Sequence, residues 1–139
     1  MKDFDKVNFG IWPTPLYKLE NMSKVLGTNI WIKRDDMCGV ALGGNKVRKL
    51  EYLLADAKKQ GYELVITTGA AQSNHAMLTA ACALKLGMEP VLALRKSGVM
   101  ECKGNLILNK LMGAEVRFCD GGCDHIFDVE MDRIGEEKG

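Results

Sequence analysis

The chain has 139 residues, of which 47% are apolar and 27% are charged, the composition of about one water-soluble globular domain. Its 19 basic and 18 acidic side chains give a net charge of +1 with no run of Lys or Arg, which argues against nucleic acid or an acidic membrane surface as a partner. The longest nearly apolar stretch, 76–84, is about half a membrane span, and no signal-peptide core follows the first residues. We therefore expect a cytoplasmic protein that does not enter the membrane.

The first elements along the chain are an extended segment and a short strand. Two prolines in Trp12-Pro-Thr-Pro-Leu favour an extended backbone. The run Ile30-Trp-Ile-Lys-Arg-Asp-Asp then predicts an apolar strand that ends in charge, and a loop over 37–44 follows it.

A unit of helix, glycine and strand is predicted three times in the rest of the chain. Gly61, Gly87 and Gly113 are spaced 26 residues apart, and an apolar run follows each of them. Glycine tolerates the left-handed turn just past a helix, and such a run is typical of a buried strand in a parallel sheet. The apolar periodicity predicts helices over 45–60, 75–86, 103–112 and 125–137. The fold class is therefore α/β, an open, mostly parallel sheet with flanking helices in three layers, with Rossmann-like topology.

The same period bears on the completeness of the domain. One further step of 26 residues reaches Gly139, where the next strand would begin. We therefore expect the chain to be the N-terminal fragment of a longer protein.

Five cysteines at irregular spacing, without an export signal, predict reduced thiols. Cys119, Cys123 and His125 form a C-x3-C-x-H cluster that could supply zinc ligands. No second ligand pair completes a tetrahedral site, so the favoured interpretation is a buried strand cysteine followed by a Gly-Gly turn, with no metal.

Chemistry is expected where parallel strands end, because helix N-termini there present free N–H groups to anions. In Gly43-Gly-Asn-Lys-Val-Arg-Lys, the glycines permit a tight turn, Asn45 is a suitable N-cap, and Lys46 falls in the first helical turn with Lys49 on the same side. The helix dipole disfavours the charged form of the Lys46 amine, and Schiff-base chemistry needs the neutral form. A solvated surface lysine is the alternative interpretation.

The second loop places Gln72, Ser73, Asn74 and His75 just before an apolar helix. Its backbone N–H groups could hold a carboxylate or phosphate, and Ser73 could relay a proton or attack a polarised substrate. Ser73 or Asn74 acting only as an N-cap is the alternative. Neither a Walker loop nor G-x-G-x-x-G is present, so a nucleotide site has no positive support.

Taken together, five motifs in register resemble one family. They are Thr14-Pro-Leu, Ile32-Lys-Arg-Asp-Asp, Gly43-Gly-Asn-Lys-Val-Arg-Lys-Leu-Glu, Gln72-Ser-Asn-His and Gly104-Asn-Leu with Met112-Gly-Ala-Glu-Val-Arg. They resemble the D-cysteine desulfhydrase and 1-aminocyclopropane-1-carboxylate deaminase family of pyridoxal-phosphate enzymes, which have the two-domain tryptophan-synthase β-like fold.

The resemblance implies a role for each site residue. Lys46 matches the lysine that holds pyridoxal phosphate and then acts as a base, and Ser73 matches the catalytic serine beside the substrate. Asn74 matches the residue that binds the cofactor's ring hydroxyl, and Asn45 and Lys49 lie where phosphate contacts are expected. The helix start at Ser73, Asn74 and His75 would take the substrate carboxylate.

The resemblance also implies the activity and the domain organisation. The favoured activity is β-elimination from D-cysteine, giving pyruvate, hydrogen sulfide and ammonia, with small amino acids as substrates and a homodimer as the full-length protein. Residues 46–139 would form most of the smaller α/β domain, and 1–45 would pack on a larger domain, leaving Trp12, Leu16 and Trp31 partly uncovered here. Met77 departs from the family, since many relatives have a basic residue there.

Three alternatives remain at this point. The same residues suit a 1-aminocyclopropane-1-carboxylate deaminase. A non-catalytic α/β module that binds a small anion or a partner chain would need no covalent bond to Lys46. An inactive truncated form is the third.

Overall fold

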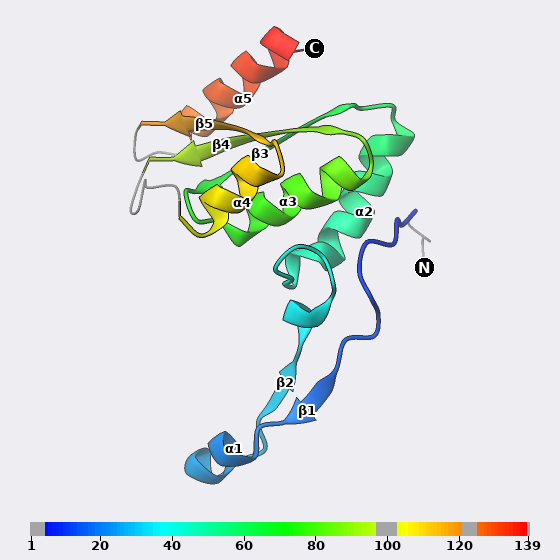
Figure 1. The fold of residues 1–139 in the computed structure, drawn as a ribbon, viewed down its shortest axis with the longest axis vertical. Coiled ribbons are helices and arrows are strands. Elements are labelled where there is room, and N and C mark those ends of the chain that lie inside the picture. Colours follow the sequence, from blue (N-terminus) through cyan, green and yellow to red (C-terminus); the bar gives the residue numbers. More distant parts are fainter. Residues whose placement is uncertain (1–4, 97–102, 121–124, 139) are drawn as a thin grey trace.

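The computed structural model describes residues 5–96, 103–120 and 125–138, and it consists of an α/β unit and a projecting arm (Figure 1). The strands β3 (Leu64–Ala70), β4 (Glu89–Arg95) and β5 (Glu115–Cys119) form a parallel sheet in the order β3-β4-β5. Val91 of the central strand pairs with Ile66 on one side and Glu115 on the other. The predicted parallel sheet with alternating helices is therefore confirmed.

Helices cover both faces of this sheet. The helices α3 (Asn74–Lys85) and α4 (Asn105–Leu111) lie on one face, and α5 (His125–Lys138) lies on the other (Figure 1). Side chains of β4 alternate accordingly, since Leu92 and Leu94 pack with α3 and α4 whereas Val91 and Ala93 pack with Ile134 of α5. The continuous apolar run of β4 thus reflects burial on both faces.

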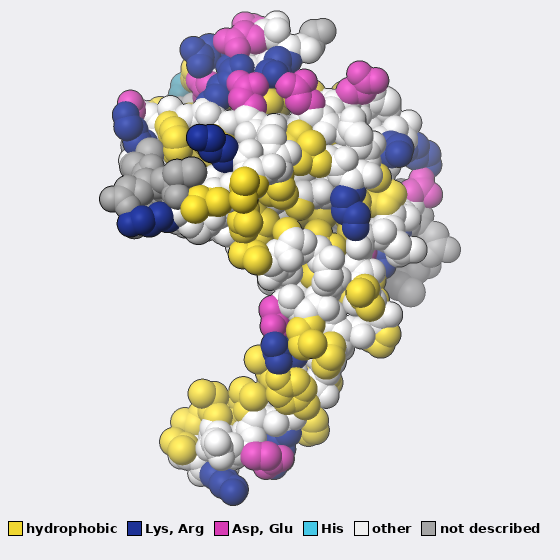
Figure 2. Space-filling view, in the orientation of Figure 1, with side chains coloured by type: hydrophobic (Ala, Val, Ile, Leu, Met, Phe, Trp, Pro, Cys, Tyr) yellow, Lys and Arg dark blue, Asp and Glu magenta, His cyan; other side chains and the backbone are white. Residues whose placement is uncertain are grey.

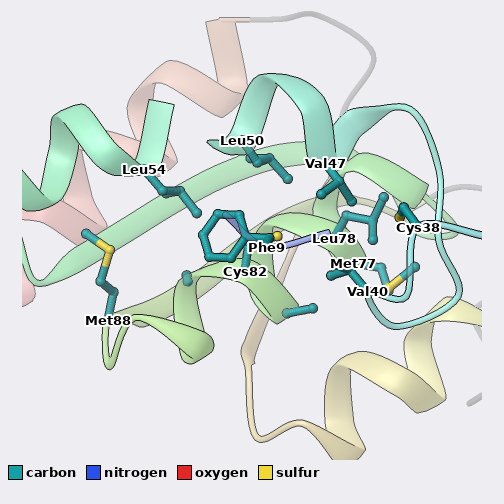
Figure 3. Close-up of a cluster of buried hydrophobic side chains, with 12 residues drawn as sticks. Phe9, Cys38, Val40, Val47, Leu50, Leu54, Met77, Leu78, Cys82 and Met88 are labelled. Atoms are coloured by element: carbon teal, nitrogen blue, oxygen red, sulfur yellow. The ribbon is translucent and has the colours of Figure 1, made fainter. Parts of the chain in front are cut away.

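A second core lies between α3 and α2 (Lys46–Lys59), which pack side by side (Figure 3). Its members come from both helices, from the two segments that precede α2 in the chain and from the turn between α3 and β4. They are Phe9, Cys38, Val40, Val47, Leu50, Leu54, Met77, Leu78, Ala81, Cys82, Ala83 and Met88. Met77 is fully buried in this core and offers no polar contact. This packing fixes the starts of α2 and α3 relative to each other.

The N-terminal segment is fastened to α2 through Glu51, whose side chain is buried. Its Oε1 accepts hydrogen bonds from the Phe9 N–H at 3.0 Å and from Trp12 Nε1 at 2.7 Å. Lys6 Nζ lies 2.9 Å from Oε2. This one carboxylate therefore satisfies several donors of a segment that has no regular structure of its own.

The arm consists of β1 (Leu16–Lys18), α1 (Glu20–Leu26) and β2 (Trp31–Lys33), with a single 3₁₀ turn at Asp35–Met37. The two strands pair antiparallel, and α1 lies at the tip, away from the sheet (Figure 1). Figure 2 shows apolar side chains gathered along the arm, where Leu16, Tyr17, Met22, Val25, Leu26 and Trp31 are exposed. The sequence predicted the strand at β2, but it pairs with β1 instead of joining the main sheet, and α1 was not predicted.

The sequence predicted reduced thiols, and it offered no metal site and no membrane span. Cys38, Cys82 and Cys119 are free and buried, and burial raises the pKa of the Cys82 thiol to about 12. Cys123 lies outside the described residues, and the described part of the chain contains no group of three or more His, Cys, Asp or Glu side chains suited to a metal ion. No helix within the described ranges is long and apolar enough to cross a bilayer.

Replacement of Asn109 by leucine is expected to stabilise the chain by about 1 kcal/mol. Asn109 in α4 is fully buried, and neither its amide nitrogen nor its oxygen has a partner among the described residues. Leucine removes the unsatisfied groups at similar volume, so the midpoint of thermal unfolding should rise. Lys110→Leu at the adjacent exposed position is the control, and an unchanged midpoint in Asn109→Leu would contradict the prediction.

Candidate active site

The loop before α2 folds tightly against the start of α3. Gly43 has a φ of 72°, and a Cβ at this position would lie 1.9 Å from the backbone oxygen of Asp36. Gly44 has a φ of 137°, and its Cβ would lie 2.6 Å from Nδ2 of Asn74. Both positions therefore require glycine. The two loops identified in the sequence meet at one corner of the structure, as their position at the ends of helices indicated.

Lys46 is the first residue of α2 and is half-buried. Asn45 occupies the N-cap position, but its backbone is in the helical region and its side chain makes no capping hydrogen bond. The expectation that Asn45 caps the helix is therefore wrong, because a capping side chain needs the extended backbone that turns it toward the helix. The exposed amide of Asn45 is not used in holding the helix.

Ser73 is the N-cap of α3. Its backbone is extended, and its Oγ accepts a hydrogen bond from the Ala76 N–H at 3.2 Å. The N–H groups of Asn74 and His75, in the first turn, have no acceptor among the described residues. Two free donors at the positive end of the helix dipole can bind an anion. The capping interpretation of Ser73 and the anion-binding interpretation of this turn are thus compatible.

Asn74 faces the first loop. Its Nδ2 lies 3.5 Å from the carbonyl oxygen of Gly43, and its side chain is exposed. An amide at this position is held near the start of α2 and retains hydrogen-bonding capacity for a ligand.

Lys49 and His75 connect the two helices. Lys49 Nζ lies 3.5 Å from Nε2 of His75, which is half-buried. Burial lowers the pKa of His75 below its usual value, and the charges of Lys49 and Lys46 lower it further. The corner therefore holds two lysines and a histidine that favours its neutral form, which is a cationic environment suited to a phosphate or carboxylate.

Gln72 and Thr79 were not among the predicted site residues, yet both shape this corner. The Gln72 Nε2 donates to the carbonyl of Lys103 at 3.0 Å, and the Gln72 Oε1 accepts from the Asn105 N–H at 2.9 Å. In return, Asn105 Nδ2 donates to the backbone oxygen of Gln72 at 2.9 Å. Gln72 thus ties the loop after β3 to the start of α4. Thr79 is buried and bonded to His75, one turn earlier. The four-residue spacing of His75 and Thr79 was the available signal in the sequence.

A family comparison matches residues 7–139 to the model described as "Pyridoxal-phosphate dependent enzyme". The chain therefore belongs to the pyridoxal-phosphate dependent enzyme family. Its relatives include proteins named for each of the two activities that the sequence motifs suggested.

A protein of Pyrococcus horikoshii, named as a candidate 1-aminocyclopropane-1-carboxylate deaminase, is 50% identical over 96% of this chain. A D-cysteine desulfhydrase of Yersinia enterocolitica is 50% identical over 78% of it. A crystal structure titled as an ACC deaminase homologue superimposes with a TM-score of 0.89 at 46% identity and covers 96% of the chain. The chain spans 41% of the Pyrococcus protein, 34% of the Yersinia protein and 41% of the crystallised chain.

The donors at the corner fit pyridoxal phosphate. The cofactor needs a primary amine for its aldehyde, cationic or N–H donors for its phosphate, and a donor for its ring hydroxyl. The half-buried amine of Lys46, the ammonium of Lys49, the free N–H groups of α3 and the amide of Asn74 supply these kinds of group within one region. Gly43 and Gly44 let the first loop pack directly against Asp36 and Asn74, which keeps Lys46 close to the start of α3.

Proposed function

We propose that this chain supplies the lysine-bearing part of a pyridoxal-phosphate-dependent lyase that converts D-cysteine and water to pyruvate, hydrogen sulfide and ammonia. The observation that carries the proposal is the position of Lys46, half-buried at the start of α2 against the start of α3. The family assignment and the D-cysteine desulfhydrase relative support it.

The residues at the corner have separate roles in this proposal. Lys46 holds the cofactor through its amine and afterwards moves a proton at the α-carbon of the substrate. Lys49 and Asn45 bind the phosphate, and Asn74 donates to the ring hydroxyl. The start of α3 at Ser73, Asn74 and His75 binds the substrate carboxylate, and the Ser73 hydroxyl takes part in proton transfer. When bound, the cofactor supplies an electron sink that stabilises negative charge at the α-carbon.

Conversion of 1-aminocyclopropane-1-carboxylate and water to 2-oxobutanoate and ammonia is the second candidate. The names of the Pyrococcus protein and of the crystallised homologue favour it. It uses the same lysine, the same carboxylate site and the same serine. The two candidates therefore differ in the bond broken in the substrate and not in the roles of the residues described here.

The surroundings of the site form part of the proposal. We propose that residues 46–139 belong to the smaller domain of the enzyme and that residues 1–45 pack on a larger domain, with a homodimer as the working form in the cytoplasm. The exposed apolar side chains of the arm, among them Leu16 and Trp31, support the packing surface. Trp12 is half-buried against Arg48, whose guanidinium carbon lies 4.2 Å from the centre of the Trp12 ring.

The test is to add pyridoxal phosphate to the full chain, reduce with borohydride and locate the modified lysine by mass spectrometry. The proposal predicts one dominant modification at Lys46. Scattered or absent modification in the enzyme would favour a non-catalytic α/β module. Sulfide release from D-cysteine, compared with 2-oxobutanoate formation from 1-aminocyclopropane-1-carboxylate, then separates the two activities.

Replacement of Ser73 by alanine is expected to lower the turnover number by about 10²-fold or more while the cofactor stays bound, because the change removes a proton-transfer group. Alanine also removes the α3 cap, at a cost of about 1 kcal/mol of folding free energy. Ser73→Gly, which lowers cap stability by only a few tenths of a kcal/mol, controls for that loss. An unchanged turnover number in both variants would remove Ser73 from the catalytic residues.

A further inference from the structure

His75 and Thr79 lie one turn apart on α3, on the side that faces α2. Thr79 is 3% exposed, and a groove of about 300 Å³ between α2, α3 and β3 includes both side chains in its lining. The rest of that lining is mainly apolar, with Leu50, Leu53, Leu54 and Ala57 from α2. Among the described residues, the cations that act on His75 are Lys49 and Lys46 of α2.

The hydrogen-bonding partners of Thr79 bear on which nitrogen of His75 carries a proton. The Thr79 hydroxyl lies 2.8 Å from the backbone oxygen of His75, which can only accept, so the hydroxyl donates its single proton there. The same hydroxyl oxygen lies 3.4 Å from Nδ1 of His75. A hydrogen bond between these two atoms then requires that Nδ1 carry the proton and donate it to Thr79.

This arrangement leaves a lone pair on the opposite side of the ring. In a neutral imidazole with Nδ1 protonated, Nε2 is an acceptor. Nε2 lies 3.5 Å from Lys49 Nζ, and an ammonium group can only donate. With this tautomer the bonds run in one direction, from Lys49 to His75 to Thr79 to the His75 carbonyl.

We infer that Thr79 and His75 are positioning residues for Lys49: buried Thr79 fixes the His75 tautomer, and Nε2 of His75 then holds the Lys49 ammonium at the phosphate side of the site. This inference rests on the proposed function in assigning the phosphate to Lys49. A lysine on an exposed helix face otherwise samples many rotamers, so a fixed acceptor reduces the freedom lost when the phosphate binds.

The first test measures the tautomer and needs no cofactor. The sequence contains two histidines, so His125→Gln leaves His75 as the single histidine for ¹⁵N labelling. His125 is exposed on α5. Long-range ¹H–¹⁵N correlation at pH 7 should show a neutral ring protonated at Nδ1. A ring protonated at Nε2 would overturn the inference.

Thr79→Val is the decisive variant because valine has the shape of threonine without the hydroxyl. The proton should move to Nε2 in Thr79→Val and stay on Nδ1 in Thr79→Ser, with far-UV circular dichroism unchanged in both. Acetylation of Lys49 relative to Lys58, an exposed lysine near the end of the same helix, should become about threefold faster in Thr79→Val only. An unchanged tautomer or an unchanged relative rate would overturn the inference.

Binding of pyridoxal phosphate links the inference to the site. Thr79→Val should raise the Kd for pyridoxal phosphate about fivefold, and it should have no further effect in a chain that already carries Lys49→Ala, since the two changes act through one amine. Equal effects in both backgrounds would overturn the positioning role. The predicted tautomer and Lys49 protection in a chain without cofactor affinity would support the inference and contradict the proposed function.

Discussion

Lys46→Ala is expected to abolish borohydride-trapped pyridoxal phosphate at the start of α2 and to lower kcat/KM by at least about 10⁴-fold. The side chain is assigned two functions, covalent attachment of the cofactor and proton transfer at the substrate, and proton transfer alone is worth about 10² to 10⁴. Alanine has a high helix propensity, so helix α2 should keep its stability. Steady-state kinetics and peptide mapping measure the two effects separately.

Lys58→Ala provides the matched control for this prediction. Lys58 is an exposed lysine in the last turn of the same helix, far along the chain from the loop at Gly43 and Gly44. The control should retain both the trapped adduct and the turnover of the parent. If Lys46→Ala kept activity within tenfold of the parent, the lysine would not carry the chemistry and the proposed function would be wrong.

Glu51→Ala is expected to lower the free energy of unfolding by about 3–5 kcal/mol, because three donors lose a buried charged acceptor at about 1–3 kcal/mol each. The buried carboxylate accepts from the backbone N–H groups of Phe9 and Gly10 and from the Trp12 indole, and it pairs with Lys6. Alanine leaves these donors without their acceptor and also creates a cavity. Urea denaturation followed by tryptophan fluorescence measures the change.

Glu51→Gln separates the charge from the hydrogen bonds. Glutamine retains an acceptor oxygen of similar position but cannot pair with Lys6, so the loss should be clearly smaller than in Glu51→Ala. Equal losses in the two variants would show that the pairing with Lys6, not the acceptor for the Phe9 and Trp12 donors, dominates the stability of the N-terminal segment.

The Glu51 contribution should also depend on pH. Burial alone raises the pKa of Glu51, but the hydrogen bonds from Trp12, Lys6, Gly10 and Phe9 outweigh it, so the folded-state pKa lies below the ordinary value of 4.5. The stabilisation is therefore fully present above about pH 4.5 and is lost as the pH falls through the lower folded-state pKa. The difference in unfolding free energy between the parent and Glu51→Gln should shrink over that interval.

The α/β unit was predictable because its signals are local. A glycine every 26 residues, a period of apolar residues in each helix and an apolar run in each strand predicted α2, α3, α4, α5 and the three parallel strands. The arm gave weaker signals. Helix α1 has seven residues and leaves Met22, Val25 and Leu26 exposed, so no core imposes a clear apolar period on it.

The candidate site also has a part that the sequence predicted and a part that it did not. The loops identified around Lys46 and Ser73 do meet, because both lie at the starts of helices that pack side by side. The contacts of Gln72 with Asn105 and of His75 with Lys49 join residues 33 and 26 positions apart. No local pattern encodes such pairs, since they depend on how the helices are oriented on the sheet. The failure of Asn45 as a cap likewise follows from its backbone conformation, which residue type alone does not determine.

The buried cysteines give the chain built-in reporters of local unfolding. Cys82 lies in the core between α2 and α3, whereas Cys119 packs beneath α5 on the opposite face of the sheet. A thiol reagent attacks the thiolate and needs access, so each cysteine reacts only when its own region opens. The ratio of their labelling rates therefore compares the free energy of opening the core between α2 and α3 with that of opening the α5 face, within a single molecule.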